Sequence, residues 1–291
     1  MKFGYLSHNN VEGIKPQHLA SELEARGFDS IWMPEHSHIP TDRRTPYPAG
    51  GELPSSYYRM MDPLISLMSA AAGSDTLELF TGICLIHEHD LLDLACACAT
   101  LDVLSGGRFH LGIGVGWNEE ELANHRPDLS FKLRYSAMRE RVAALRVAWS
   151  EERASFDGTW DSFSESFVYP KPTRGTIPIS LGNAGPVGIK HAADYADEWC
   201  PIDASMLNVN GRPDVPGAIE LFRRLATEAG RDPDSIPITI HSFKVSESRF
   251  EQYAALGVER IVLFPPSMDV VSVDVTLTHL DKLTEVVQQF A

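Results

Sequence analysis

The chain has 291 residues, of which 43% are hydrophobic and 22% charged, the composition of a globular protein with a sizeable core. Its net charge of -15 repels polyanions, so nucleic acid and anionic membrane are poor partners, although a local backbone site can still bind phosphate. No apolar run is long enough to span a membrane, and the amino terminus does not read as a signal peptide. The four cysteines match no zinc or redox motif, and we expect a cytoplasmic protein with reduced thiols.

Strand-like and helix-like segments alternate along the first half of the chain. The predicted strands are residues 2–7, 30–34, 77–86 and 109–115. Helical spacing of apolar residues predicts helices around residues 19–27, 62–73, 91–104 and 138–149. Asp62 followed by Pro63 is a typical helix start, with a capping carboxylate and proline in the first turn.

The second half repeats this order. The predicted strands are residues 177–181, 198–202, 236–240 and 260–264, and the predicted helices are residues 187–196, 219–230, 250–256 and 277–290. Eight such units in one domain spanning residues 1–291 predict an α/β fold of the (β/α)8 TIM-barrel type. An open dinucleotide-binding sheet would need a glycine-rich turn after the first strand, where His8 and Asn9 stand.

Two segments do not fit the repeat. Residues 41–59 are rich in Pro, Gly and Tyr, and residues 151–176 are rich in Ser, Pro and aromatic residues. Long loops within a compact domain are commonly lids or binding loops, so we expect both insertions at the C-terminal face of the barrel, bordering a substrate pocket. Plain surface loops are the alternative.

Polar residues gather where the predicted strands end, which is where barrel enzymes place their catalytic groups. Glu35 and His36 follow the apolar second strand. A histidine there can exchange a proton near neutral pH, and an adjacent carboxylate can orient it. We therefore predict His36 and Glu35 as catalytic residues, against the alternative that His36 is structural.

Two glycine-rich strand ends are candidate cofactor sites. Gly182, Asn183, Ala184 and Gly185 join a strand to a helix, where backbone N–H groups can approach an anion, although a tight turn would need the same residues. Alternate glycines at residues 112–116 leave one strand face bare, which admits either a flat ring or a bulky neighbouring side chain.

Two His-x-His patterns raise the question of a metal. They lie at His36 and His38 and at His87 and His89. Zinc hydrolases built on barrels add a carboxylate at a late strand end, and Pro265 and Pro266 stand there instead. We expect no metal.

Three stretches resemble a known family. ATLDVLSGGRFHLGIGVGWNEEEL (residues 99–122), GFDSIWMPEH (27–36) and PISLGNAGPVGIKHAADYADEWCPI (178–202) resemble luciferase-like flavin and deazaflavin oxidoreductases, with most likeness to the F420-dependent subgroup. The resemblance covers nearly the whole chain in the right order. It implies a barrel with coenzyme F420 or FMN inside its top.

The resemblance also assigns roles to residues. It places His36 at the active-site histidine and Glu35 at its acidic neighbour. It places Thr81 and Gly82 where a non-prolyl cis peptide often faces the cofactor ring. The residues that it implies for cofactor binding are Thr81, Gly82, Gly114, Gly116, Asn118, Gly182, Asn183, Ala184 and Gly185. One departure is Trp117, which stands where some sugar-phosphate-oxidising members carry a glutamate proton donor.

The expected function is F420-dependent hydride transfer to or from a small organic substrate. An FMN-dependent monooxygenase is the alternative, and a barrel that binds cofactor without turnover is a third hypothesis. A homodimer is left open beside a monomer.

Overall fold

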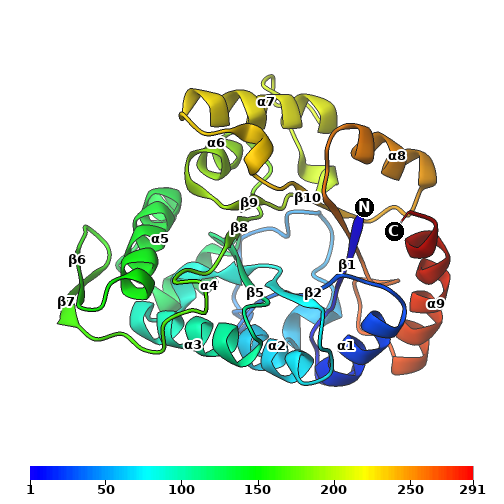
Figure 1. Ribbon diagram of the computed structural model, residues 1–291, viewed down its shortest axis with the longest axis horizontal. Coiled ribbons are helices and arrows are strands. Elements are labelled where there is room, and N and C mark those ends of the chain that lie inside the picture. The colour runs from blue at the N-terminus through cyan, green and yellow to red at the C-terminus, as the bar shows by residue number, and fades with distance from the viewer. Residues whose placement is uncertain (291) are drawn as a thin grey trace.

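The computed structural model describes residues 1–290 and confirms the (β/α)8 barrel. Hydrogen-bonded neighbours follow the order β10-β11-β1-β2-β3-β5-β8-β9, and every pairing along this path is parallel. Two parallel bridges, Trp199 to Ile238 and Ile202 to His241, bring β9 beside β10 and nearly close the barrel. The helices surround these strands, and the two chain ends lie side by side (Figure 1).

The barrel strands are β1 (Lys2–Leu6), β2 (Ser30–Met33), β3 (Glu78–Thr81), β5 (Phe109–Gly114), β8 (Ile179–Leu181), β9 (Glu198–Trp199), β10 (Thr239–Ser242) and β11 (Arg260–Leu263). The helices are α1 (Pro16–Ala25), α2 (Pro63–Ala71), α3 (Leu91–Leu104), α4 (Glu119–His125), α5 (Arg134–Ser150), α6 (Pro186–Tyr195), α7 (Val215–Glu228), α8 (Glu247–Ala255) and α9 (Val273–Phe290). Short additions are β4 (Cys84–Leu85), β6 (Ala154–Asp157), β7 (Ser162–Ser166), η1 (Ser55–Tyr58), η2 (Ile86–Glu88), η3 (Phe131–Leu133), η4 (Asp203–Ser205) and η5 (Pro233–Ser235).

Local chemistry sets several helix starts. The Asp62 carboxylate accepts from the backbone N–H of Ile65, which confirms the predicted start of α2. Asp90 caps α3 and Asp214 caps α7 in the same way. Among residues 1–290, no helix combines the length and apolar character that a membrane span requires.

The barrel interior is filled by stacked rings. Trp32 on β2 lies parallel to Phe80 on β3 with ring centroids 3.9 Å apart. His241 on β10 meets Trp32 edge-on at 4.7 Å, and all three side chains are buried. Aromatic packing of this kind closes the centre of the barrel, so a ligand must bind above it, at the C-terminal ends of the strands.

All eight predicted strands differ in their end residues from those in the structure, and two of them differ by a division or a shift. The strand predicted for residues 77–86 divides into β3 and β4, with Gly82 and Ile83 between them. The strand predicted for residues 236–240 is β10, shifted to Thr239–Ser242. Pro237 explains the shift, because proline has no N–H to donate to a ladder and uses only its carbonyl, which accepts from Trp199.

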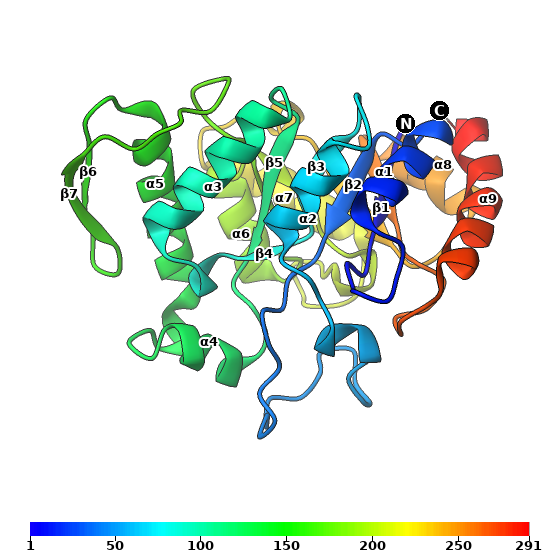
Figure 2. The same cartoon turned by 90° about the horizontal axis from the view of Figure 1, so that it is seen from below.

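The two insertions lie on different sides of the molecule. Residues 41–59 extend from the end of β2 on the same side as α4 (Figure 2). Residues 151–176 instead form the β6–β7 hairpin at the outer edge of the barrel, where it packs on α5. The hairpin is held by a buried ion pair between Arg141 and Asp161 at 2.6 Å. Only the first insertion reaches His36, because α5 runs back along the barrel before the second begins.

Candidate active site

His36 lies just beyond the end of β2, and its imidazole is bonded on both nitrogens. Nδ1 is 2.7 Å from Oε2 of Glu121 on α4. The indole Nε1–H of Trp117, which follows β5, donates to Nε2 over 3.3 Å. His36 and Glu121 are both buried. The ends of two strands thus hold one histidine between a carboxylate and an indole.

Three aromatic side chains surround this histidine, and we call them the aromatic lid: Tyr47, Tyr57 and Trp117. The ring of His36 lies 5.1 Å from that of Tyr57 and 5.6 Å from that of Trp117. Tyr47 meets Tyr57 at 5.4 Å and Trp117 at 6.0 Å. The guanidinium of Arg43 lies 5.4 Å from the Trp117 ring, so a positive charge borders this apolar cover.

Glu120 on α4 binds the insertion of residues 41–59, which carries Tyr47 and Tyr57 of the aromatic lid. Its carboxylate accepts from Oγ1 of Thr45 at 2.7 Å and from the backbone N–H groups of Arg44 and Thr45 at 3.1 and 3.3 Å. Burial raises the pKa of Glu120, but these hydrogen bonds outweigh it and lower the pKa to about 2. The carboxylate is therefore ionised at neutral pH, and its bonds keep the lid over His36.

Glu35 does not contact His36; its carboxylate bonds elsewhere. One oxygen accepts from the backbone N–H of Leu85 at 2.6 Å, and the other is 2.8 Å from Nε2 of His89. Ligand atoms of Glu35, Cys84 and His89 lie within 4.8 Å of one another. The Glu35–His89 hydrogen bond accounts for this proximity without an ion, and burial raises the pKa of the Cys84 thiol, which disfavours a thiolate ligand.

Thr81, Gly82 and Gly114 form the wall at the end of β3 and β5. The Thr81 hydroxyl donates to the carbonyl of Gly112 over 2.7 Å. The non-prolyl cis peptide lies between Gly82 and Ile83, one bond later than the pair named from the resemblance. Ile83 projects over Gly114 and reaches Gly182, so its side chain occupies the space above both glycines.

Gly116 and Asn118 shape the turn between β5 and α4. Gly116 has a φ of 71°, a conformation that favours glycine. Asn118 donates through Nδ2 to Oε2 of Glu121 at 3.4 Å. Its Oδ1 is buried and has no hydrogen-bond partner within residues 1–290. A ligand donor is a natural partner for such an atom.

The turn from Gly182 to Gly185 leads from β8 into α6. Gly185 is the N-cap, it has no capping side chain, and a Cβ added there would meet no atom within 4 Å. Asn183 accepts from the Tyr135 hydroxyl at 3.3 Å, while its Nδ2 is buried and lacks a partner in the described part of the chain. Ala184 is buried beside them. Open space, free N–H groups and an unused amide donor together suit an anion.

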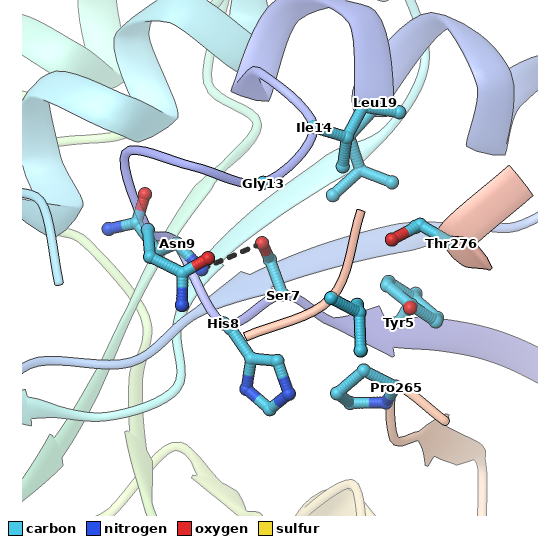
Figure 3. A pocket seen from close by; sticks show the side chains of 11 residues that line it. Tyr5, Ser7, His8, Asn9, Gly13, Ile14, Leu19, Pro265 and Thr276 are labelled. Carbon is cyan, nitrogen blue, oxygen red and sulfur yellow. Dashed lines mark hydrogen bonds between the residues drawn. The ribbon is translucent and has the colours of Figure 1, made fainter. Parts of the chain in front are cut away.

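A small cavity lies beside the end of β1 (Figure 3). Tyr5, Ser7, His8 and Asn9 border it, and the backbone N–H of Asn9 donates to Ser7 Oγ over 2.9 Å. Its volume of about 20 Å³ holds water and not a ring cofactor. His8 and Asn9 are further engaged with the carbonyls of Ser267 and Met61.

Sequence reasoning missed Glu121 and the two tyrosines of the lid. The only available signal for Glu121 was the run Glu119-Glu120-Glu121 directly after a glycine-rich strand end. In a helix, three consecutive residues point in three directions, and here Glu119 is exposed, Glu120 binds the lid and Glu121 turns inward. The sequence does not say which of the three faces the site.

The comparisons with known proteins agree with this architecture. The model of a family described as luciferase-like monooxygenase matches residues 2–259. An uncharacterized protein of Mycobacterium tuberculosis is 32% identical over 289 residues, covering 97% of each chain. The chain therefore belongs to the luciferase-like monooxygenase family.

More distant relatives include oxidoreductases with named cofactors. The F420-dependent hydroxymycolic acid dehydrogenase of M. tuberculosis is 26% identical and aligns with 79% of this chain and 59% of its own length. The coenzyme F420-dependent tetrahydromethanopterin reductase of Methanopyrus kandleri has a TM-score of 0.76 at 18% identity, covering 100% of this chain and 99% of that one. The FMN complex of 3,6-diketocamphane monooxygenase from Pseudomonas putida has a TM-score of 0.64 at 17% identity, covering 84% of this chain and 68% of that one.

Proposed function

We propose that this chain is an F420-dependent oxidoreductase that transfers a hydride between the deazaflavin and a small organic substrate, with His36 as the proton partner. The observation that carries the proposal is the placement of a buried imidazole, bonded to Glu121 and Trp117, at the strand ends of the barrel. The named F420-dependent relative and the F420-dependent structural neighbour support the choice of cofactor.

The residues present fit a phosphate-bearing ring cofactor. The N-terminus of α6 at Gly185 offers open space and free backbone N–H groups for a phosphate. The buried Nδ2 of Asn183 and Oδ1 of Asn118 lack protein partners among residues 1–290, so a ligand can satisfy one acceptor and one donor there. When bound, F420 supplies a two-electron hydride carrier.

The chain's own residues supply positioning and proton transfer. His36 gives a proton to a substrate oxygen, or takes one from it, through Nε2, the nitrogen that Trp117 contacts. Tyr47, Tyr57 and Trp117 cover this nitrogen and limit the access of water. Arg43 beside Trp117 favours a substrate with a partial or full negative charge on the side facing the insertion.

An FMN-dependent monooxygenase is the second candidate, favoured by the likeness to the FMN-bound diketocamphane enzyme. The test is parallel titration of the purified protein with F420 and FMN, followed by fluorescence, and then incubation of the preferred complex with a panel of alcohols, aldehydes and ketones. Tighter binding of F420 and substrate-dependent bleaching support the proposal. Tighter FMN binding with substrate-dependent oxygen uptake supports the monooxygenase, and cofactor binding without turnover supports a carrier.

A further inference from the structure

The geometry points to Glu121 as the positioning residue of this site. We infer that Glu121 holds the neutral His36 ring in the tautomer with hydrogen on Nδ1, which leaves Nε2 as the nitrogen that exchanges the proton. The inference rests on the proposed function for the role of His36, while the tautomer itself can be measured without cofactor or substrate.

Both neighbours of the imidazole select the same tautomer. An indole N–H can only donate, so Trp117 requires Nε2 of His36 to accept, and Nε2 then carries no hydrogen. A carboxylate oxygen accepts from an N–H, so the 2.7 Å contact with Glu121 favours hydrogen on Nδ1. The 2.7 Å bond from Nδ1 to Glu121 is the shorter of the two, and a charged acceptor makes it the stronger.

The partners of Glu121 make a purely structural role a poor explanation. Its Oε2 is shared by His36 and, at 3.4 Å, by Asn118. Its Oε1 is buried and has no hydrogen-bond partner within residues 1–290, and no Lys or Arg of these residues forms an ion pair with it. A buried carboxylate with one oxygen unpaired is costly for the fold, so its position beside His36 suits an orienting function.

Burial and the lid keep this pair isolated. The exposed fractions of the His36 and Glu121 side chains are 7% and 1%, so water does not compete for their bond. Trp117 is the only side chain among residues 1–290 that hydrogen-bonds Nε2. A substrate oxygen that reaches Nε2 therefore takes the place of the indole N–H, and the ring needs no rotation before proton transfer.

The test is ¹⁵N NMR of histidine-labelled protein without ligand, at a pH where the ring is neutral, because the shifts of the two ring nitrogens identify the tautomer. The His36 signals are assigned as those absent from His36→Gln. Glu121→Leu removes the acceptor, whereas Glu121→Gln retains an oxygen at the same place. Glu119→Gln is the matched control, since Glu119 is exposed in the same turn of α4.

We expect a single Nδ1–H tautomer in the parent protein, in Glu119→Gln and in Glu121→Gln. In Glu121→Leu we expect a mixture with the Nε2–H form, because the 3.3 Å hydrogen bond from Trp117 is too long to hold the tautomer without the carboxylate. A mixture in the parent protein, or an unchanged tautomer in a folded Glu121→Leu, would overturn the inference. If Glu121→Leu does not fold, Glu121→Asp is examined instead, because its shorter side chain withdraws the acceptor. A single Nδ1–H tautomer in Glu121→Asp would also overturn the inference. Failure to bind F420 would contradict the proposed function and leave the tautomer result standing.

Discussion

The side chain of Ile83 lies where a Cβ on Gly114 would be, so the bare face of β5 is occupied by a residue from the end of β3. The alternate glycines of residues 112–116 allowed either a flat ring or a bulky side chain against this face, and the structure shows a neighbouring side chain there. Gly112 is similarly close to the carbonyl of Thr81. These glycines let β5 approach β3 and its continuation.

Gly114→Ala should therefore destabilise the protein in the absence of any cofactor. Overpacking against Ile83 is expected to lower the free energy of unfolding by about 1–3 kcal/mol, measured by urea denaturation. Gly185→Ala is the control, because a Cβ at Gly185 meets no atom within 4 Å. Normal stability of Gly114→Ala with weakened cofactor binding would show that the space above Gly114 serves the cofactor instead.

His36→Ala should lower turnover by about 10²–10⁴-fold, the usual contribution of a general acid or base. Cofactor affinity should stay within a few-fold, because the turn from Gly182 to Gly185 that we propose for the phosphate is built from another strand end. Steady-state rates with the best substrate of the panel, together with cofactor titration, measure both effects. His38→Ala is the control, since His38 bonds to Ser37 and Asn124 near the surface. Equal losses in the two variants would argue that the histidines act on structure.

Gly185→Asp should weaken F420 binding by about tenfold or more, because a carboxylate would stand where a phosphate is expected. The substitution has steric room, and Asp is a favourable N-cap, so α6 should be retained or slightly stabilised. Gly185→Asn provides the neutral match with the same capping ability. Parallel fluorescence titrations compare the two, and equal affinity for both variants would place the phosphate elsewhere.

Glu35→Leu should destabilise the fold by about 1–3 kcal/mol, because it leaves the buried N–H of Leu85 without an acceptor. Glu35→Gln retains an acceptor oxygen and should cost less. Both are measured by urea denaturation. Turnover of Glu35→Gln should remain close to that of the parent protein, since Glu35 does not contact His36. A large loss of turnover in a stable Glu35→Gln would restore Glu35 as a catalytic residue.

Three buried groups with large pKa shifts should make stability depend on pH. Burial lowers the pKa of His87 and of His241 to about 4 from 6.5, so the unfolded chain binds two more protons between these values. Burial, together with the charges of Glu121 and Glu35, raises the pKa of Glu88 to about 9 from 4.5, so the folded chain binds one more proton in that window.

Together, these pKa shifts predict that stability is greatest near pH 6.5. From pH 4.5 to 6.5 these three groups give the unfolded state one net extra proton, so they should make stability rise with pH by about 1.4 kcal/mol per unit. Burial also lowers the pKa of His8, His191 and His279, which acts in the same direction. Above pH 6.5 the folded chain holds protons on Glu88 and on His89, whose pKa is raised by its hydrogen bond to Glu35 against the effect of burial, so stability should fall as pH rises towards 9. Urea denaturation over this range measures both slopes. Glu88→Gln should reduce the alkaline slope and His241→Leu should reduce the acidic one; unchanged slopes in both variants would contradict the assignment.

The amino-acid sequence alone determined the order of the barrel. The period of apolar residues distinguishes strands from helices, and eight alternating units leave few ways to bury both faces of a parallel sheet. The sequence also placed His36 and the Gly182–Gly185 turn at strand ends, because these positions follow directly from where each apolar run stops. Such features depend on residues that are close in sequence.

Only the tertiary structure decided which side chains meet. His36 and Glu121 are 85 residues apart, and their contact depends on the direction of α4, which starts three residues after Gly116, a glycine at positive φ. Glu35 adjoins His36 in sequence, yet successive side chains of an extended segment point to opposite sides, so it reaches Leu85 and His89 instead. Glu121, and not Glu35, is therefore the carboxylate that contacts His36, and we propose the orienting role for it.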